Sequence, residues 1–304
     1  MNVFVTGATG ALGRPVSRML IDTGHHVFAL ARSSRNELRI REMGAEPVRG
    51  DLFETSSVRN AVRNSEAILH LATHIPNSSQ AARRQSWREN DRIRIEGTRN
   101  LVNLALEFGV STVIYPGVVF AYRDAGEQWL DSTSPLDRLP ILESSFTAEA
   151  EVQRFTSAGR RGVVLRMGGF YGPASVTTRE LYRAARYGIA LFFGPAKAYQ
   201  PLIWIEDAAL AVVDALSRAP AGIYDIVDDE PMQRHELASV LAGIVGRKRL
   251  WRPPALLLRI WAGKNAMFLT RSQRVSNRRF KEATGWSPTV DSARLGMKLL
   301  AIEP

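Results

Sequence analysis

The opening stretch, Met1 to Arg35, constrains the fold more than any other part of the chain. Its apolar run Val3 to Val5 is typical of a buried parallel strand. A helix from about Ala11 to Leu20 and a second strand, His26 to Ala31, follow a glycine-rich turn. The turn reads TGATGALG, and its glycines recur every three residues: Gly7, Gly10 and Gly13. This order predicts a βαβ unit.

Each part of this unit suits a dinucleotide. The first two glycines let the backbone approach a pyrophosphate, and the third lets the helix pack closely on the strand. The helix N-terminus then directs amide groups at the phosphates. A plain glycine turn is the alternative interpretation, but the strand-turn-helix-strand context favours dinucleotide binding.

The residues that follow the second strand indicate which dinucleotide is bound. At this place in the fold an acidic residue holds the ribose 2′-hydroxyl, whereas an arginine accommodates a 2′-phosphate. The strand is followed by Arg32 and Ser33, with Arg35 two positions further on. We therefore predict NADP in preference to NAD. The alternative is that both arginines are only solvated.

Strand and helix patterns continue to alternate after this unit, which predicts an α/β fold with a doubly wound parallel sheet of Rossmann type. The expected strands are 46–49, 67–72, 112–115 and 162–167. The expected helices are 35–43, 56–63, 89–108 and 144–157.

Composition excludes several other kinds of site. The chain has no cysteine, so a disulfide framework and a cysteine metal site are excluded, and its five histidines show no metal-ligand spacing. The net charge is +10, but the basic residues are spread along the chain without a nucleic-acid module, so we expect no nucleic-acid partner. We expect no membrane span and no cleaved leader, and hence a cytoplasmic protein.

One basic run stands apart from this even spread. Arg271 to Arg279 reads RSQRVSNRR. We expect a solvated helix face there, and contact with an acidic ligand or partner is the alternative.

Several further motifs occur in a fixed order along the chain. They are Asp51-Leu52, LHLAT, EGTRNLV, LRMGGFYGP, WIEDAALAVVDAL and TGWSPT. With the glycine-rich turn, this set resembles the extended short-chain dehydrogenase/reductase superfamily, and within it the NAD-dependent epimerase/dehydratase branch. The resemblance implies a Rossmann domain over 1–176, completed by about 201–227. It also implies a smaller, interleaved C-terminal substrate lobe made of 177–200 and 228–304.

The resemblance further implies a set of cofactor-binding residues. The pyrophosphate loop would comprise Gly7, Thr9, Gly10, Ala11, Leu12 and Gly13. The adenine would meet Asp51 and Leu52, and the ribose and nicotinamide side would meet Leu71, Ala72 and Thr73. The nicotinamide ring would be approached by Gly117, Gly169 and Phe170.

The standard catalytic set of that family is missing. The family uses a serine or threonine after strand five and a Tyr-x-x-x-Lys pair, in which the lysine lowers the pKa of the tyrosine for proton transfer. No lysine precedes Lys197, and no tyrosine has a lysine four positions later. Alignment with the family pattern puts Glu143 at the tyrosine position and Thr147 at the lysine position, and it puts Arg94 at the position of a helix asparagine.

Three residues are candidates to replace that set. Tyr122 lies close to the usual position after strand five, Glu143 occupies the tyrosine position, and His74 follows strand four. A carboxylate acts as acid or base near neutral pH only if burial raises its pKa. The alternatives are a packed aromatic ring for Tyr122, a helix cap for Glu143 and a rim histidine for His74.

The sequence keeps the expected cofactor-binding residues but lacks the family's proton-transfer residues. Three functions are compatible with this combination. The first is an NADP-dependent oxidoreductase or isomerase with replacement catalytic groups. The second is a non-redox dehydratase or cyclase, and the third is a catalytically inactive, NADP-sensing regulatory protein. By resemblance, a homodimer would form through the helices 89–108 and 144–157.

Aromatic residues around the expected substrate lobe suit a small aromatic or apolar molecule better than a nucleotide sugar. They are Tyr171, Tyr182, Tyr187, Phe192, Phe193, Tyr199 and Trp204. For any one of them, packing in the core is the alternative.

Overall fold

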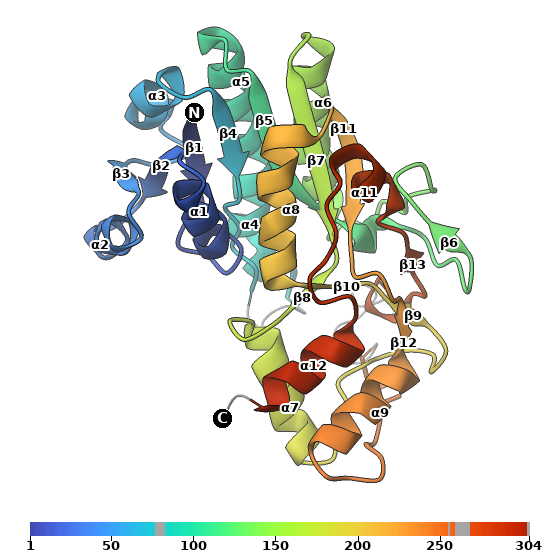
Figure 1. The fold of residues 1–304 in the computed structure, drawn as a ribbon. Coiled ribbons are helices and arrows are strands. Elements are labelled where there is room, and N and C mark those ends of the chain that lie inside the picture. The colour runs from blue at the N-terminus through green and yellow to red at the C-terminus, as the bar shows by residue number, and fades with distance from the viewer. Residues whose placement is uncertain (77–82, 255, 259–267, 303–304) are drawn as a thin grey trace.

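A parallel sheet of seven strands, in the order β11-β7-β5-β4-β1-β2-β3, forms the centre of the molecule (Figure 1). The computed structural model describes residues 1–76, 83–254, 256–258 and 268–302. The seven strands are β1 (Asn2–Thr6), β2 (His26–Ala31), β3 (Glu46–Arg49), β4 (Ala67–His70), β5 (Thr112–Val118), β7 (Arg161–Met167) and β11 (Gly222–Ile226). The predicted Rossmann-type fold is confirmed.

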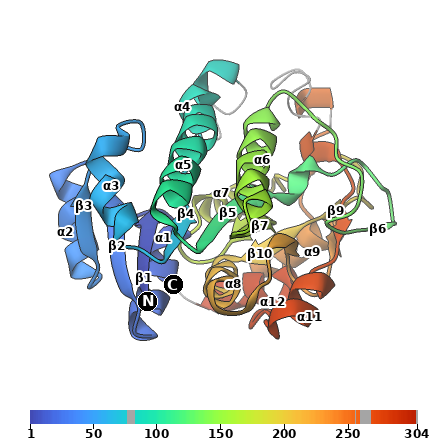
Figure 2. The same cartoon turned by 90° about the horizontal axis from the view of Figure 1, so that it is seen from above.

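Helices cover both faces of this sheet, as the view from above shows (Figure 2). One face carries α1 (Gly13–Asp22) and α8 (Ile205–Arg218). The other carries α3 (Thr55–Arg63), α5 (Thr98–Phe108) and α6 (Glu143–Ser157), while α2 (Ser34–Glu42) lies beside β3 at the edge. Along β1, Val3 and Val5 pack in the first core and Phe4 packs in the second. The strand therefore alternates between two buried faces, which explains its uninterrupted apolar sequence.

The expected elements differ from the observed ones mainly at their ends. Helix α1 begins at Gly13, because Ala11 and Leu12 still belong to the glycine-rich turn. Strand β4 ends at His70, two residues before the expected end, and β5 continues to Val118. The predicted helix 89–108 consists of α4 (Arg88–Arg92), a wide π-helical turn η2 (Ile93–Gly97) and α5.

A smaller lobe lies beyond the carboxyl ends of the sheet strands (Figure 1). Its helices are α7 (Val176–Arg186), α9 (Arg234–Ile244) and α12 (Ala293–Ile302), which share a hydrophobic core of their own. Short strand pairs connect it to the sheet layer: β8 (Gly169–Tyr171) with β10 (Leu202–Trp204), and β9 (Tyr199–Gln200) with β12 (Met232–Gln233). Two single-turn 3-10 helices, η1 (Arg84–Trp87) and η3 (Val119–Ala121), complete the regular structure on the sheet side.

The division into two domains stays a proposal, and one segment bears on its boundaries. Phe280 of α11 (Arg278–Thr284) and Trp286 belong to the range expected in the lobe, yet both pack in the core between the sheet and α8. Asp207, near the start of α8, accepts hydrogen bonds from the amides of Thr289 and Val290 at 2.8 and 2.9 Å. This buried carboxylate ties the segment after Trp286 to the sheet domain.

The expectation of a solvated helix face at Arg271 to Arg279 is wrong for most of this segment. Its centre is a strand, β13 (Arg274–Val275), which pairs in parallel with β6 (Trp129–Leu130). Arg271 is buried, donates to the Tyr122 carbonyl at 3.0 Å and forms an ion pair with Asp137. Pairing with a strand about 145 positions away is a long-range contact that local sequence does not encode.

Among the described helices, none is long and apolar enough to cross a membrane.

Candidate functional site

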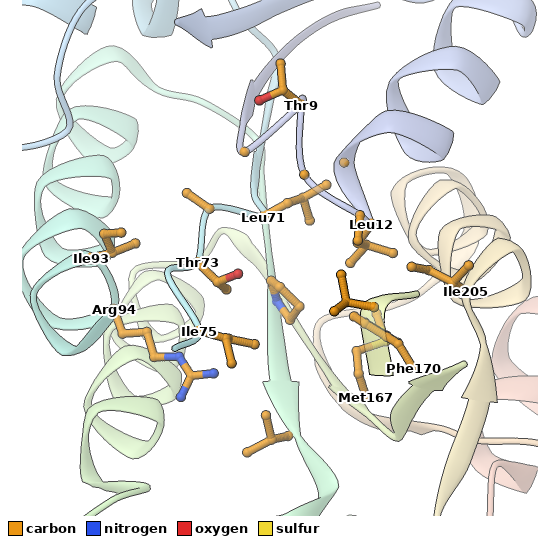
Figure 3. A pocket seen from close by; sticks show the side chains of 18 of the residues that line it. Thr9, Leu12, Leu71, Thr73, Ile75, Ile93, Arg94, Met167, Phe170 and Ile205 are labelled. Atoms are coloured by element: carbon orange, nitrogen blue, oxygen red, sulfur yellow. The ribbon is translucent and has the colours of Figure 1, made fainter. Parts of the chain in front are cut away.

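A cavity of about 670 Å³ opens between the carboxyl ends of the sheet strands and the lobe (Figure 3). It is lined by the glycine-rich turn, the segment after β4, the end of β5, residues 167–170 and the start of α7. In parallel α/β sheets, ligands bind at this edge, where the strand order reverses on either side of the first strand. The cavity is therefore the candidate binding site.

The glycine-rich turn fits its surroundings only because its glycines lack a side chain. Gly7 has a φ of +75°, and a Cβ built on it would lie 2.6 Å from the Ala72 amide nitrogen. A Cβ on Gly13 would lie 2.0 Å from the Gly7 carbonyl oxygen. The turn is thus pressed against the end of β4 on one side and against the first turn of α1 on the other.

This packing leaves backbone donors available at the start of α1. Among the described residues, no hydrogen-bond acceptor is found for the amides of Ala11, Leu12 and Gly13. The first turn of α1 contains no acidic side chain, and Leu12 provides no side-chain cap. Free amides at a helix N-terminus beside a glycine cradle fit a pyrophosphate, because they supply donors and positive potential together.

Arg32 is the residue of the basic segment after β2 that the structure brings into the cavity wall. Its Nη1 lies 3.3 Å from Glu89 Oε1, and its side chain is about half exposed. Ser33 caps α2 by accepting the Asn36 amide at 3.3 Å, and neither Ser33 nor Arg35 is among the described lining residues. Asn36 lines the cavity and was missed from the sequence, because only the turn into α2 directs it there.

The other predicted cofactor residues all lie along this one cavity. They are Asp51, Leu52, Gly7, Thr9, Gly10, Ala11, Leu12, Gly13, Leu71, Ala72, Thr73, Gly117, Gly169 and Phe170. Asp51 accepts the Phe53 amide at 2.9 Å, which fixes its carboxylate beside β3. The residues present therefore fit a dinucleotide, although their contact with one stays a prediction.

The three candidate catalytic residues are not brought together, and the described lining residues include none of them. Tyr122 is fully buried, and its hydroxyl donates to Asp225 Oδ1 at 2.7 Å. Glu143 begins α6, is half exposed and lies 3.6 Å from the Arg138 guanidinium. His74 is exposed, and its backbone amide donates to Asn90 Oδ1 at 3.1 Å. Their catalytic roles stay predictions.

A buried polar network lies directly beneath the cavity floor. Arg166 donates to both carboxylate oxygens of Glu149, at 3.2 and 2.8 Å, and to the Tyr122 hydroxyl at 3.0 Å. A Cβ on Gly117, a lining residue, would lie 2.6 Å from Glu149 Oε1. Glycine at this position thus lets the cavity floor rest on the network.

Burial changes the ionisation of this network. Removal from water raises the pKa of Asp225 from 3.8 to about 7, although the hydrogen bond from Tyr122 and the charge of Arg166 oppose the shift. Burial and the neighbouring Asp225 also raise the pKa of the Tyr122 hydroxyl, so Tyr122 holds its proton more firmly than a free tyrosine.

Asp225→Asn is expected to remove a pH dependence of stability. Between about pH 4 and pH 7 the unfolded chain has lost the Asp225 proton while the folded chain keeps it, so wild-type stability falls as pH rises through this window. The advantage of the asparagine variant should grow across the window to a few kcal/mol and stay constant above it. Urea unfolding at pH 5 and pH 8 measures this, with exposed Asp22→Asn as the control. A constant difference between Asp225→Asn and wild type at both pH values would contradict it.

The π-helical turn η2 is held against the sheet by a buried histidine. His70 Nδ1 lies 2.7 Å from the Thr6 hydroxyl, and its Nε2 lies 3.4 Å from the Ile93 carbonyl. Burial lowers the pKa of His70 to about 4, so the ring is neutral at neutral pH. A neutral ring that donates from Nε2 and accepts at Nδ1 satisfies both contacts.

Arg94 follows in the same π turn and lines the cavity (Figure 3). The sequence identified it only as the residue at the family's asparagine position.

The seven aromatic residues expected around the substrate are absent from the described cavity lining, and the aromatic lining residues are Phe53, Phe120 and Phe170. The described residues also include no group of three or more histidine, aspartate or glutamate side chains that could hold a metal ion.

The chain was compared with protein-family models, with curated proteins and with solved structures. A model of the NAD dependent epimerase/dehydratase family matches residues 3–226. A 3-diazoavenalumate denitrifying reductase of a Streptomyces species is 29% identical over 98% of this chain and 99% of its own. A 2-alkyl-3-oxoalkanoate reductase of Stenotrophomonas maltophilia is 27% identical over 86% of this chain and 83% of its own. Among solved structures, human epimerase family protein SDR39U1 with NADPH has a TM-score of 0.80 at 21% identity and covers 100% of both chains.

Proposed function

Because this chain belongs to the NAD dependent epimerase/dehydratase family, we propose that it is an NADP(H)-dependent oxidoreductase that acts on a small, largely apolar molecule. The observation that carries the proposal is the single cavity that runs from the glycine-rich turn to the ends of β5 and β7. A dinucleotide held at the turn and a small molecule beside Phe170 would share it. When bound, the cofactor would supply a hydride at its nicotinamide ring.

The residues of this chain would do the holding and orienting. The amides of Ala11, Leu12 and Gly13 would bind the pyrophosphate, and Arg32 would pair with the 2′-phosphate. Apolar side chains of Val118, Met167 and Phe170 line the far part of the cavity, where they would exclude water from the reacting atoms.

A site without the Tyr-x-x-x-Lys pair favours a hydride acceptor that needs no phenol to protonate an oxyanion. The name of the Streptomyces relative describes a reduction of a diazo compound with loss of nitrogen. Reductive loss of a neutral diazo group takes up a hydride from the cofactor and a proton from solvent at carbon and expels dinitrogen. It forms no oxyanion, which matches a cavity that Tyr122 does not enter. We propose the same independence from a phenolic acid for this chain.

The names of both relatives also bear on the substrate. An avenalumate and an alkanoate are carboxylate anions. We therefore propose that the substrate is a small organic acid rather than a nucleotide sugar.

Transfer of label from NADPH deuterated at C4 tests the function. With small diazo acids as the expected acceptors and small oxo acids as the comparison, deuterium in the product of either supports the oxidoreductase, and a preference for the diazo acids supports the independence from a phenolic acid. Turnover without label transfer would instead favour the non-redox dehydratase or cyclase, and NADPH binding without turnover would favour the NADP-sensing protein. If neither NADPH nor NADH changes fluorescence on addition of the protein, the proposal fails altogether.

Arg32→Asp is expected to reverse the cofactor preference. Loss of a charge-assisted contact with the 2′-phosphate should weaken NADPH binding by about 10- to 100-fold, while a carboxylate can accept the ribose hydroxyl of NADH. Arg35→Asp is the matched control, because it makes the same charge change outside the described cavity lining. Fluorescence titration with both cofactors gives the ratio of affinities. Equal losses in the two variants would mean that only the local charge matters and that Arg32 makes no specific contact.

We also propose that the chain acts in the cytoplasm as a homodimer, built from the α4-η2-α5 and α6 helices. Light scattering after gel filtration measures the mass in solution, and a monomer at micromolar concentration would contradict the dimer.

A further inference from the structure

Arg94 is a buried cation that no other described residue neutralises. Only 5% of its surface is exposed, and its guanidinium makes no hydrogen bond or ion pair with any described residue. The Nε atom is shielded from solvent and has no acceptor. Figure 3 shows the guanidinium beside Ile75 in the cavity, well away from Thr9 of the glycine-rich turn.

Without a bound ligand, this arrangement lowers the stability of the folded protein. An arginine keeps its charge at any ordinary pH, and a buried charge without a partner is strongly unfavourable. The neighbouring acidic groups do not compensate it. Both oxygens of buried Glu149 are occupied by Arg166, and Arg94 forms no ion pair with any carboxylate among the described residues.

The backbone that carries Arg94 is restrained on the side away from the cavity. It belongs to the π turn η2, whose Ile93 carbonyl lies against the buried His70 ring. Such π turns interrupt a regular helix and occur often at functional sites. On the cavity side, Asn90 of α4 accepts the His74 amide and so fixes the segment that carries Thr73 and Ile75. The guanidinium is therefore set on rigid elements that face the cavity.

We propose that Arg94 binds the carboxylate of the substrate and thereby selects small organic acids. The inference deepens the proposed function and rests on it. A planar guanidinium presents paired donors that match a carboxylate, and one carboxylate neutralises one arginine. A phosphate dianion beside a single arginine would leave one negative charge uncompensated, which makes a carboxylate the better match.

Binding of simple acids and their amides tests the proposal without any turnover. Benzoate and hexanoate are compared with benzamide and hexanamide by calorimetry, using the full chain saturated with NADP⁺. We expect the acids to bind the wild type at least about 10-fold more tightly than the amides. Arg94→Met should weaken benzoate at least about 10-fold and leave benzamide within about 2-fold, and Arg94→Lys should keep part of the preference.

A matched control and a stability measurement separate binding from a structural role. Arg99→Met removes an exposed arginine of α5 that is paired with Glu151, so it should leave all four affinities unchanged. Because Arg94→Met removes a buried charge that no described residue neutralises, the melting temperature of the variant should rise by a few degrees rather than fall.

Several outcomes would overturn the role of Arg94. They are absence of acid binding to the NADP⁺-bound wild type, unchanged benzoate affinity in both Arg94 variants, and equal losses for benzoate and benzamide. A lower melting temperature of Arg94→Met would also overturn it, because it would mark a structural arginine. NADP⁺ affinity is measured in the same samples. If the wild type binds no NADP⁺, the proposed function fails, whereas normal NADP⁺ affinity without acid selectivity rejects Arg94 alone.

Discussion

Gly13→Ala is expected to weaken NADPH binding by at least about 100-fold, although alanine is the better helix former. The added Cβ would lie 2.0 Å from the Gly7 carbonyl oxygen, which itself accepts the Gly10 amide at 2.9 Å. The three nearest atoms all belong to the backbone of Gly7 and Ala8, so no flexible side chain can move aside. The start of α1 must therefore shift, and the amides that face the cavity shift with it. Overpacking of this kind also costs about 1–3 kcal/mol of stability.

The matched control for this change is Gly243→Ala in α9. A Cβ on Gly243 would meet no atom within 4 Å, so the same substitution should stabilise the protein by about 0.5–1 kcal/mol. Fluorescence titration with NADPH and urea unfolding of both variants give the two measurements. If Gly13→Ala binds NADPH as the wild type does, the glycine-rich turn is not the phosphate site.

Arg166→Met is expected to destabilise the protein by about 3–5 kcal/mol. The side chains of Arg166 and Glu149 are only 3% and 6% exposed, so removal of the guanidinium leaves the Glu149 carboxylate buried without its partner. The Tyr122 hydroxyl loses a donor at the same time. Urea unfolding of the variant and the wild type measures this.

Removal of both partners separates the buried charge from simple packing. The double variant Arg166→Met with Glu149→Leu leaves no buried ion, so it should recover most of the stability that the single variant loses. Arg154→Met breaks an exposed pair with Glu151 and should cost less than about 1 kcal/mol. A double variant as unstable as Arg166→Met alone would show that the guanidinium acts through its packing and not through its charge.

Much of the fold was accessible from the sequence because its signals are local. The apolar runs of β1 and β2 and the glycine spacing after β1 each involve residues close together in the chain. The part of the cavity beside the glycine-rich turn could be predicted for the same reason, because a turn and a helix start form its main wall. Element ends were less certain, as with α1, since helix and turn compete for the same residues.

The part of the cavity away from the glycine-rich turn was harder to predict from the sequence. The aromatic residues of the lobe were expected near the substrate, but Tyr171 and Trp204 pack edge to face in the core of the lobe, with ring centroids 5.4 Å apart. The composition gives the number of aromatic residues, whereas their burial depends on which helices and strands pack together. Arg94 carried no sequence signal beyond its position in an alignment.

The sequence by itself determined the βαβ unit, the parallel sheet and the glycine-rich turn, because steric and periodic constraints act over a few residues. Only the tertiary structure decided which charges are paired. It joins Tyr122 to Asp225 and Glu149 to Arg166, and it gives Arg94 in the cavity wall no charged partner among the described residues. Charge pairing depends on distance and burial in three dimensions, and residues far apart in the chain set both.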